Sequence, residues 1–594
     1  MTRSLPPLAG LVPEHLRAGA DLLAEGRALT KEWRVGSNRF LAAEGVASEA
    51  DYKRRETVRG RIMQHAHIGF RSVDRTISAM AEVRETCAGR GITVDRFGIT
   101  LDWSMGFPLE GRAARPKGTG IVLRGPEDFA LITNATASAA HFGDFMLGLP
   151  GALDNTKAAI AAGGTAIGNL GQYFTFRLPF WDDDVATTEA TVTALGLIAA
   201  QEAEVLVHSN LDDGFAGLFA DMGSALGMVL VEKHIVETLI GARLSHCYGH
   251  HFTAPLVRLA FHRALTTITG TPGTMLFGNT VSYKSSPAGN FASLASYLQA
   301  DIWALRRTGS GHAINPVPVT ENERIPDVDE IVDAQTFAAR MVEHADASLG
   351  LLDPQPIEAM AARLVAAGRT FAANVLAGLA AHGVDTNDAA ALMLALRRIG
   401  PKTLEAVFGA GVLQPSAVGG RQPVVMAEWV EELEESAAHW TGKVPSERRG
   451  RIAARSLRAC IGTSDVHEHG KALIERVFAG LGVEPVDGGT SVDPAVLVDA
   501  AIAGSADLIA VSTYNGIALC YAREVQAALK ARGASLPVCI GGRLNQIPED
   551  SNSGLPVDVS AEIAALGVTP CATPEDLAKW LDRLPTRVPA EAGG

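Results

Sequence analysis

The sequence predicts a mixed α/β protein with an N-terminal (β/α)8 TIM-type barrel and a C-terminal flavodoxin-like (Rossmann-like) domain. Two observations predict this fold. Strand-like apolar runs alternate with helical runs from about 62 to 350, as they do in a barrel of repeated strand–helix units. Three strand–loop segments between about 455 and 585 then follow at the ~20–40-residue spacing of a parallel, doubly wound sheet. A chain of 594 residues is long enough for two or three domains.

Composition limits the classes of partner. The net charge of −14 argues against a nucleic-acid surface, and 47% hydrophobic with 20% charged residues is typical of a soluble globular protein. No apolar run reaches the ~18–20 residues of a membrane span, and no signal-peptide core is present. The six cysteines are scattered without CxxC pairs, which predicts reduced thiols in a cytoplasmic protein and no zinc or iron–sulfur site.

The first 60 residues are predicted to form a helical extension, because the stretch from Leu16 to Trp33 has apolar residues at helical spacing. The charge-rich stretch from Asp51 to Arg61 is interpreted as a connector. The barrel is then expected over 61–350, with a doubly wound sheet as the alternative. Its expected strands are Phe97–Leu101, Phe129–Thr133, Thr165–Asn169, Glu204–His208, Leu244–Tyr248, Thr274–Gly278 and Ala313–Pro318.

Three further segments complete the expected organisation. Residues 351–412 are predicted to form Ala- and Leu-rich helices, and 413–452 are predicted to form a linker that carries one acidic helix. The C-terminal domain is expected over 453–594, with strands at Ala459–Ser464, Asp507–Ser512 and Pro537–Gly542.

The loop after the first of these strands carries the sharpest signal. Asp465 and His467 stand two residues apart in the run DVHEHG, which ends at Gly470, and a helical run follows. Such a loop lies at the carboxyl edge of a parallel sheet, where open α/β folds bind ligands. A neutral imidazole can ligate a transition metal there through one nitrogen, while a nearby carboxylate holds the other. A solvated helix start capped by an aspartate is the alternative interpretation.

This loop resembles the DxHxxG loop of cobalamin-binding domains. The resemblance implies that His467 is the lower ligand of cobalt, that Asp465 holds the His467 ring, and that Gly470 makes room for the displaced nucleotide tail. The later strand ends, Ser512 to Gly516 and Cys539 to Gly542, are similar to the SxL and GG motifs that line the tail slot. The implied cofactor contacts there are Ser512, Tyr514 (where Leu is usual), Gly516, Gly541, Gly542 and Thr573.

The N-terminal part resembles the catalytic subunit of glutamate (methylaspartate) mutase and 2-methyleneglutarate mutase. The run from His67 to Ser72 is similar to the first barrel strand of that family, which implies that Arg71 grips a substrate carboxylate. Arg177 lies in a turn similar to the family's YNVPY turn. His250 lies in a YGE-like strand end, and Glu321 lies near the segment that contacts the adenosyl ribose. His208 is a candidate because it ends a predicted strand, where barrel active sites lie.

Each of these candidates has a structural alternative. Arg71 and Arg177 could form surface ion pairs, His208 and His250 could be core or rim histidines, and Glu321 could lie in a solvated turn. The sequence also departs from the family. The family's amine-binding Glu falls at about Asn169 or Leu170, and its two Tyr positions become Phe176 and Phe180. These departures favour a less charged or non-amino acid as substrate.

The sequence as a whole predicts an adenosylcobalamin-dependent carbon-skeleton mutase that acts on a small carboxylic acid. A corrinoid-dependent methyltransferase, an acyl-CoA mutase and a cobalamin sensor are the alternatives. The resemblance also implies a homodimer or higher homo-oligomer, with no nucleic-acid or membrane partner.

Overall fold

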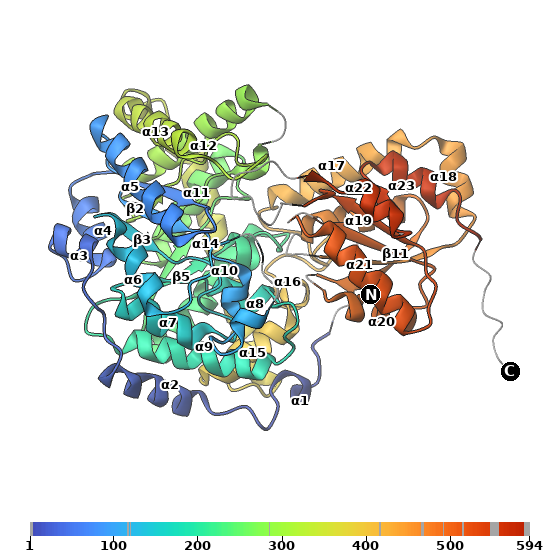
Figure 1. Cartoon of the computed structure of the whole chain (residues 1–594), viewed down its shortest axis with the longest axis horizontal. Helices are drawn as coiled ribbons and strands as arrows, with labels where there is room; N and C mark the ends of the chain where they lie inside the picture. The colour runs from blue at the N-terminus through green and yellow to red at the C-terminus, as the bar shows by residue number, and fades with distance from the viewer. Residues whose placement is uncertain are drawn as a thin grey trace. The chain divides into compact units, whose positions relative to one another are not determined.

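The chain forms two compact units in a computed structural model (Figure 1). The N-terminal unit comprises Met1–Phe176 and Asp183–Glu428, and the C-terminal unit comprises Arg177–Asp182 and Trp429–Gly594. The structure describes residues 4–115, 118, 120–283, 286–414, 417–464, 468–490, 492–513, 516–546 and 557–586, with only the backbone of 468 and 469.

The N-terminal unit contains parallel strands in two sheets. One sheet has the order β3-β2-β1-β8-β7 and the other has the order β4-β5-β6. Single parallel bridges between Phe142 and Ile167 and between Tyr248 and Leu276 connect the two sheets, and a third joins Leu101 to Ile121. The ladders therefore form two sheets rather than one continuous ring. The strands are β1 (Met63–Ile68), β2 (Arg96–Ile99), β3 (Ala139–His141), β4 (Ala166–Ile167), β5 (Leu206–Asn210), β6 (Arg243–Cys247), β7 (Met275–Leu276) and β8 (Ala313–Ile314).

Helices connect these parallel strands, as parallel pairing requires. Two short π-helical turns, η4 (Asp212–Ala216) and η5 (His234–Ile240), and the 3-10 turns η2 (Trp103–Gly106), η3 (Arg112–Ala114) and η6 (Thr280–Ser282) lie among them. The α-helices are α5 (Val73–Gly89), α6 (Pro126–Ala135), α7 (Ala152–Ala161), α8 (Gly171–Thr175), α9 (Asp184–Ala199), α10 (Met222–Lys233), α11 (Pro255–Ile268), α12 (Pro287–Arg307) and α13 (Val328–Leu349).

One expected strand is wrong. Phe129–Thr133 lies within helix α6, and the strand of this repeat is β3, ten residues later. Pro126 at the first helical position and two acidic residues in the first turn favour the helix, because they suit its fixed φ and its dipole. Phe129, Ile132 and Thr133 are buried at i, i+3 and i+4, so the apolar run follows a helical period.

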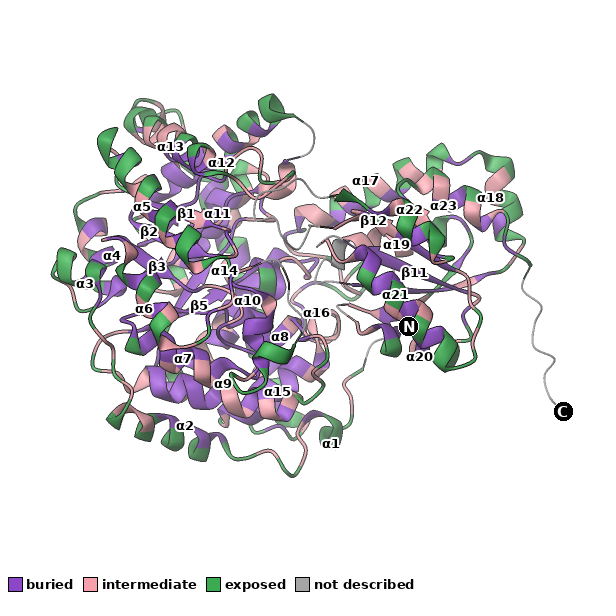
Figure 2. Cartoon of the chain, in the orientation of Figure 1, coloured by how far each residue is buried: buried purple, intermediate pink, exposed green. Residues whose placement is uncertain are grey.

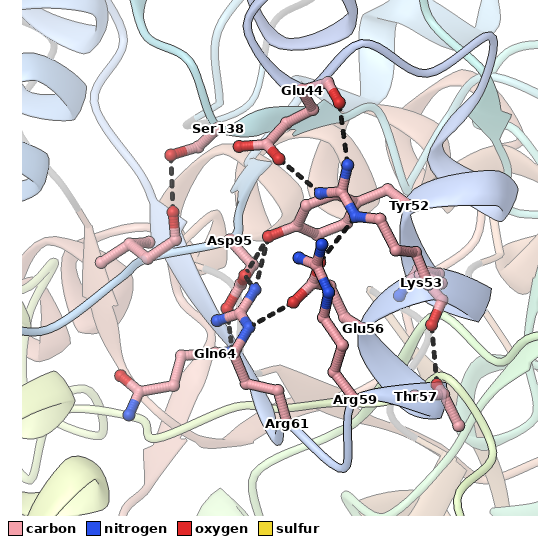
Figure 3. Close-up of polar contacts among 12 residues, drawn as sticks. Glu44, Tyr52, Lys53, Glu56, Thr57, Arg59, Arg61, Gln64, Asp95 and Ser138 are labelled. Atoms are coloured by element: carbon pink, nitrogen blue, oxygen red, sulfur yellow. Dashed lines mark hydrogen bonds and ion pairs between the residues drawn. The ribbon is translucent and has the colours of Figure 1, made fainter.

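The expected connector from Asp51 to Arg61 is mostly helix α4 (Glu49–Val58), which follows α1 (Leu8–Leu11), α2 (Gly19–Ala28), η1 (Leu29–Lys31) and α3 (Arg39–Glu44). Charged side chains anchor α4 to the strands (Figure 3). Tyr52 donates to Asp95 Oδ1 at 2.5 Å, and Arg61 donates to Glu56 Oε2 at 2.7 Å. Asp95 also accepts from the backbone N of Gln64 at 2.7 Å, which ties the network to β1.

Helices α14 (Pro354–Ala381), α15 (Ala389–Ile399) and α16 (Pro401–Phe408) fill the stretch for which helices were expected. Among the described residues, α14 is the one helix long and apolar enough to cross a membrane by length and composition alone. It packs against α10 and α11, as a core helix of a globular unit does. Figure 2 shows buried residues concentrated on the strands and along α10.

The C-terminal unit is a doubly wound α/β sheet. Its parallel strands have the order β10-β9-β11-β12-β15, which is the flavodoxin-like order 2-1-3-4-5. They are β9 (Arg458–Thr463), β10 (Glu484–Gly489), β11 (Leu508–Thr513), β12 (Val538–Gly542) and β15 (Thr569–Cys571), and β13 (Asn545–Gln546) pairs with β14 (Val557–Asp558) in a small antiparallel ladder.

Two apolar cores cover the two faces of this sheet. Leu497 and Val525 pack on one face, and Phe478 and Leu581 pack on the other. The helices that supply these residues and their neighbours are α17 (Glu428–Lys443), α18 (Ser446–Ala453), α19 (Glu468–Gly480), α20 (Pro494–Ala503), α21 (Ala518–Ala531), α22 (Ser560–Ala565) and α23 (Pro574–Leu581). The three strands expected here coincide with β9, β11 and β12.

Candidate functional site

A polar pocket lies at the carboxyl ends of the strands in the N-terminal unit. Because parallel strands end at the same edge, residues far apart in sequence meet there. The pocket holds about 270 Å³ of empty space, part of it open to solvent. Its lining includes His67, His141, Asp144, His208, Asn210 and Phe277.

Three histidines from different strands form the floor of this pocket. The His141 and His208 rings meet edge to face with centroids 4.6 Å apart, and Nδ1 of His208 lies 2.9 Å from Oγ1 of Thr274. Burial lowers the pKa of His67 to about 4, and it lowers those of His141 and His208 well below the ordinary value. The positive charge of Arg96 acts in the same direction on all three. The rings are therefore neutral near neutral pH.

Next to the histidines lies a buried set of charges, with Glu49 and Lys53 from α4 and Arg96 from β2. Arg96 Nε lies 2.9 Å from Glu49 Oε1, and Arg96 Nη1 lies 3.2 Å from Nδ1 of His65. Lys53 donates to the carbonyl oxygens of Thr274 and Gly311, both at 2.9 Å. Burial lowers the pKa of Lys53 to about 7, so its charge is easily lost. This set fixes the strands from inside and places one positive charge under the pocket floor.

His141 has unused hydrogen-bonding capacity. It is 1% exposed, and neither of its ring nitrogens has a hydrogen-bond partner among the described residues. A neutral imidazole offers one donor and one acceptor, and buried polar groups are seldom left unpaired. His141 is thus suited to contact a bound molecule.

Asp144 lines the pocket, and shared amide donors hold Asp213 near it. Asn169 Nδ2 donates to Asp144 Oδ1 at 3.3 Å and to Asp213 Oδ2 at 3.0 Å, and Asn210 Nδ2 donates to Asp213 Oδ2 at 2.9 Å. Limited solvation raises the pKa of both carboxyl groups, and the negative charge of Asp144 further raises that of Asp213. The pair therefore holds a proton more readily than an isolated carboxylate.

Asp212, the neighbour of Asp213, organises the loop after β6. Its carboxylate accepts from the backbone N of Gly249 at 2.7 Å, of His250 at 2.9 Å and of His251 at 3.1 Å. Burial acts to raise the pKa of Asp212, but the hydrogen bond and charge of His251 lower it. Asp212 is therefore a structural anion beside the mouth of the pocket.

The structure brings only part of the expected site together. His208 lines the pocket, and His250 lies next to it with its ring edge-on to Phe277 at 5.6 Å. Arg71 is half-buried in the turn after β1, Glu321 is exposed, and Arg177 clusters with the C-terminal unit. None of these three is among the residues that line the pocket.

Sequence reasoning missed His141 and Asp144 as site residues, and it considered Asp213 only as a partner of His208 and not of Asp144. The run Ala139-Ala140-His141, with its small residues and final histidine, is a short buried strand that could have indicated His141. The two aspartates come from different repeats, and only the fold places them side by side.

In the C-terminal unit, the central part of the expected cofactor loop (Asp465 and His467) and Tyr514 lie outside the described residues. The flanks are described: β9 ends at Thr463 and α19 begins at Glu468. Thr573 is the N-cap of α23, because its hydroxyl accepts from Asp576 N at 3.2 Å.

Small residues crowd the carboxyl edge of this sheet. A Cβ on Gly470 would lie 2.5 Å from Ser512 Oγ, and one on Gly542 would lie 2.2 Å from the Thr513 carbonyl oxygen. Gly542 and Gly516 have φ of 102° and 70°, which favours glycine. Gly541 is equally confined, since its Cβ would lie 2.9 Å from the Cys571 carbonyl oxygen. A side chain at Gly541 or Gly542 would clash with a backbone carbonyl oxygen, so close packing of the chain against itself requires glycine at both positions.

Among the described residues, no group of three or more His, Cys, Asp or Glu side chains is arranged to hold a metal ion. No family model matches the chain, and no curated protein is similar to it. Solved structures do match, among them the "1.5 Angstrom crystal structure of a novel cobalamin-binding protein from Desulfitobacterium hafniense DCB-2". That match is 21% identical, covers 26% of this chain and 79% of the other, and has a TM-score of 0.19.

Proposed function

We propose that this chain is an adenosylcobalamin-dependent radical isomerase, a carbon-skeleton mutase of a small carboxylic acid similar to glutamate mutase and 2-methyleneglutarate mutase. One observation carries the proposal. The run from Asp465 to Gly470 joins the end of β9 to the start of α19, in a sheet of flavodoxin-like order. That is the edge at which such sheets bind their ligands.

In this proposal His467 ligates cobalt through one ring nitrogen, and Asp465 holds the other nitrogen and fixes the tautomer. Ser512, Gly516, Gly541 and Gly542 are proposed to contact the nucleotide tail, on the family resemblance alone. When bound, the cofactor supplies radical chemistry that no side chain can supply. The protein's own contribution is to bind and orient the substrate and to exclude water from it.

We further propose that the strands of the N-terminal unit form a (β/α)8 barrel. Each strand has its sequence neighbours as parallel partners, through a ladder or through the two single bridges, and β1 pairs with β8. The pocket then lies at the carboxyl end of the barrel, where barrel enzymes hold their substrates.

The residues proposed to act on the substrate are His208 in the pocket and His250 beside it. Arg71 is proposed to hold a substrate carboxylate, with Arg177 and Glu321 as further contacts, on the family resemblance alone. A cytoplasmic location is proposed as well, supported by six free cysteines of which five are buried. A homo-oligomer remains a proposal from the resemblance.

The test has two stages. Apoprotein is titrated with adenosylcobalamin, and the affinity is measured for wild type, for His467→Gly and for the exposed-histidine control His439→Gln. Wild type and control should bind with similar affinity, and His467→Gly should bind more weakly. Loaded protein is then screened by electron paramagnetic resonance with glutamate, 2-methyleneglutarate and acyl-CoA esters. A radical signal with one compound supports the mutase. Methyl transfer from methylcobalamin, without a radical signal, would replace the mutase with a methyltransferase.

A further inference from the structure

The strongest unassigned feature is a strap of six residues, Arg177–Asp182. By its contacts this strap belongs to the C-terminal unit, whereas the residues on both sides of it belong to the N-terminal unit. Two adjacent arginines of α15 fix its two ends. Arg397 donates to the carbonyl oxygen of Phe176 at 3.2 Å, and Arg398 pairs with Asp184 through contacts of 2.7 and 2.9 Å. The ends are therefore held, and the position of the strap depends on what holds its tip.

The tip of the strap is a turn with a strained residue. Trp181 N donates to the carbonyl oxygen of Leu178 at 3.2 Å, with Pro179 and Phe180 between them. Phe180 has φ of 62°, a backbone conformation in which glycine is usual, and its side chain is 42% exposed. Such a conformation persists only where surrounding contacts determine it, and strained residues of this kind are common in switch regions.

Asp493 supplies a contact that holds the tip. Both of its carboxylate oxygens lie 3.2 Å from the backbone N of Phe180. Asp493 is also the N-cap residue of α20, a position where an aspartate ordinarily accepts from its own helix, yet its side chain forms no such bond. The carboxylate therefore contacts the strap instead of capping the helix that follows it.

The residue before Asp493 connects the same loop to the proposed cobalamin site. Val492 N donates to the carbonyl oxygen of Thr463 at 3.1 Å, and the Tyr521 hydroxyl donates to the carbonyl oxygen of Val492 at 2.6 Å. Thr463 is the last residue of β9, two residues before Asp465. A ligand held by the run after β9 thus restrains the end of that strand and, through Val492, the loop that carries Asp493.

The first end of the strap leads to the strand-end pocket of the N-terminal unit. The rings of Phe176 and Phe145 meet with centroids 5.7 Å apart, and Phe145 N donates to Gln172 Oε1 of α8 at 2.9 Å. Phe145 directly follows Asp144, which lines the pocket. The strap is therefore continuous with one wall of this pocket.

We propose that the strap is a latch, that Asp493 is the positioning residue that holds it, and that cobalamin bound at 465–470 strengthens this contact. The identity of the ligand rests on the proposed function, whereas the latch does not. Because coupling between two equilibria is reciprocal, a latched strap in turn raises the affinity for cobalamin. Loss of the latch should then weaken cobalamin binding, although Asp493 is not among the residues proposed to contact the cofactor.

Limited digestion of the full chain with chymotrypsin, without cofactor, tests the latch. Phe180 and Trp181 are aromatic cleavage sites, and mass spectrometry of the fragments gives the rate of cleavage after them. Asp493→Ala removes the acceptor and should speed this cleavage about tenfold, because cleavage follows the population of the open strap. Asp493→Asn keeps one acceptor oxygen and should stay within about threefold of wild type. Equal rates in wild type and Asp493→Ala would overturn the latch.

The matched control is an N-cap aspartate that does cap its helix. Asp353 begins α14 and accepts from Gln355 N at 2.9 Å. Asp353→Ala therefore loses a capping bond without touching the strap, and its strap cleavage should equal that of wild type. Faster strap cleavage in this control as well would assign the effect to general loss of stability and contradict the role of Asp493.

The second stage adds saturating adenosylcobalamin. In wild type the cofactor should slow strap cleavage about fivefold. In Asp493→Ala it should have no such effect, and the cobalamin affinity of this variant should be lower by a similar factor. Bound cobalamin that leaves cleavage of the wild type unchanged would overturn the coupling. Absence of cobalamin binding would overturn the proposed function and the coupling with it, while the first stage still decides on the latch.

Discussion

The rings of His141 and His208 meet edge to face, with centroids 4.6 Å apart and planes at 87°. His141 ends β3 and His208 lies within β5, 67 positions later in the sequence, yet both line one pocket. His208 is fixed by Thr274, whereas His141 has no partner of its own among the described residues. The wall thus combines an anchored ring with one that can contact a ligand.

The Thr274 anchor gives a first prediction. Thr274→Val removes the hydroxyl that contacts His208 Nδ1 and also donates to the His246 carbonyl oxygen at 3.1 Å. Leaving those buried groups unpaired should lower the free energy of unfolding by about 1–3 kcal/mol. Urea denaturation measures it, with the exposed Thr267→Val as control, expected within about 0.5 kcal/mol of wild type. Equal stabilities of the two variants would contradict this role for Thr274.

A buried ion pair near the pocket mouth gives a second prediction. Arg258 contacts Asp301 through Nε at 2.5 Å and Nη2 at 2.8 Å, and it donates to the carbonyl oxygen of Gly249 at 2.6 Å. Arg258→Met should cost about 3–5 kcal/mol, because Asp301 is left buried and unpaired. The neighbouring Arg263 pairs with Glu358 at the surface, so Arg263→Met should cost at most about 1 kcal/mol. Denaturation curves of the two variants test the difference, and similar losses would count against it.

Buried histidines predict a loss of stability in acid. Burial lowers the pKa of His67 and of His262 to about 4, so both are neutral in the folded protein. In the unfolded chain they take up protons near about pH 6.5, so stability is retained above that pH and falls as pH drops toward about 4. Each such group contributes up to about 1.4 kcal/mol per pH unit.

This acid effect can be assigned to one residue. His262 Nε2 contacts only Ser310 Oγ, at 2.9 Å, among the described residues. In His262→Gln the stability lost between about pH 7 and about pH 5.5 should shrink by roughly 1 kcal/mol relative to wild type. The exposed His439→Gln should show the full loss. An unchanged loss in His262→Gln would contradict the sign or the size of the shift.

The glycines at the carboxyl edge of the C-terminal sheet give a further prediction. One substitution there should lower cobalamin affinity while it leaves the stability of the fold almost unchanged. The Cβ of Gly470→Ala would lie 2.5 Å from Ser512 Oγ, a flexible group that can rotate aside. Stability should change by less than about 1 kcal/mol, while cobalamin affinity should fall, because the displaced hydroxyl enters the proposed tail slot. Gly470→Ala with Ser512→Ala should restore affinity. Gly442→Ala in α17, where a Cβ meets nothing, is the control. Equal affinity in all four proteins would exclude this slot.

The sequence predicted the C-terminal unit better than the N-terminal one, for a physical reason. Its strands β9, β11 and β12 are buried apolar runs of five or six residues that end in small polar or glycine residues. In the N-terminal unit, β4, β7 and β8 have only two residues each, and α6 carries an apolar run that resembles a strand. Strands of two residues are too short for a strand-like apolar pattern to be recognised in the sequence.

The residues of the candidate site were harder to predict than the fold. His208 could be predicted because it lies in a well-defined strand, but Asp144 and Asp213 could not be paired from sequence, since a fold is needed to bring β3 and β5 to one rim. Arg71 was expected from its motif, yet the pocket lining does not include it. A motif shows the order of residue types along the chain. The composition of the site depends instead on which strand ends the fold brings together.

The most direct test of the central claim is the electron paramagnetic resonance spectrum of the protein bound to cob(II)alamin, recorded with natural and with 15N-labelled histidine. If His467 ligates cobalt, the three-line nitrogen splitting of the natural protein becomes a two-line splitting in the labelled protein. It is then lost in His467→Gly. A three-line splitting that survives histidine labelling would show that the cofactor's own base remains the ligand, and would contradict the account.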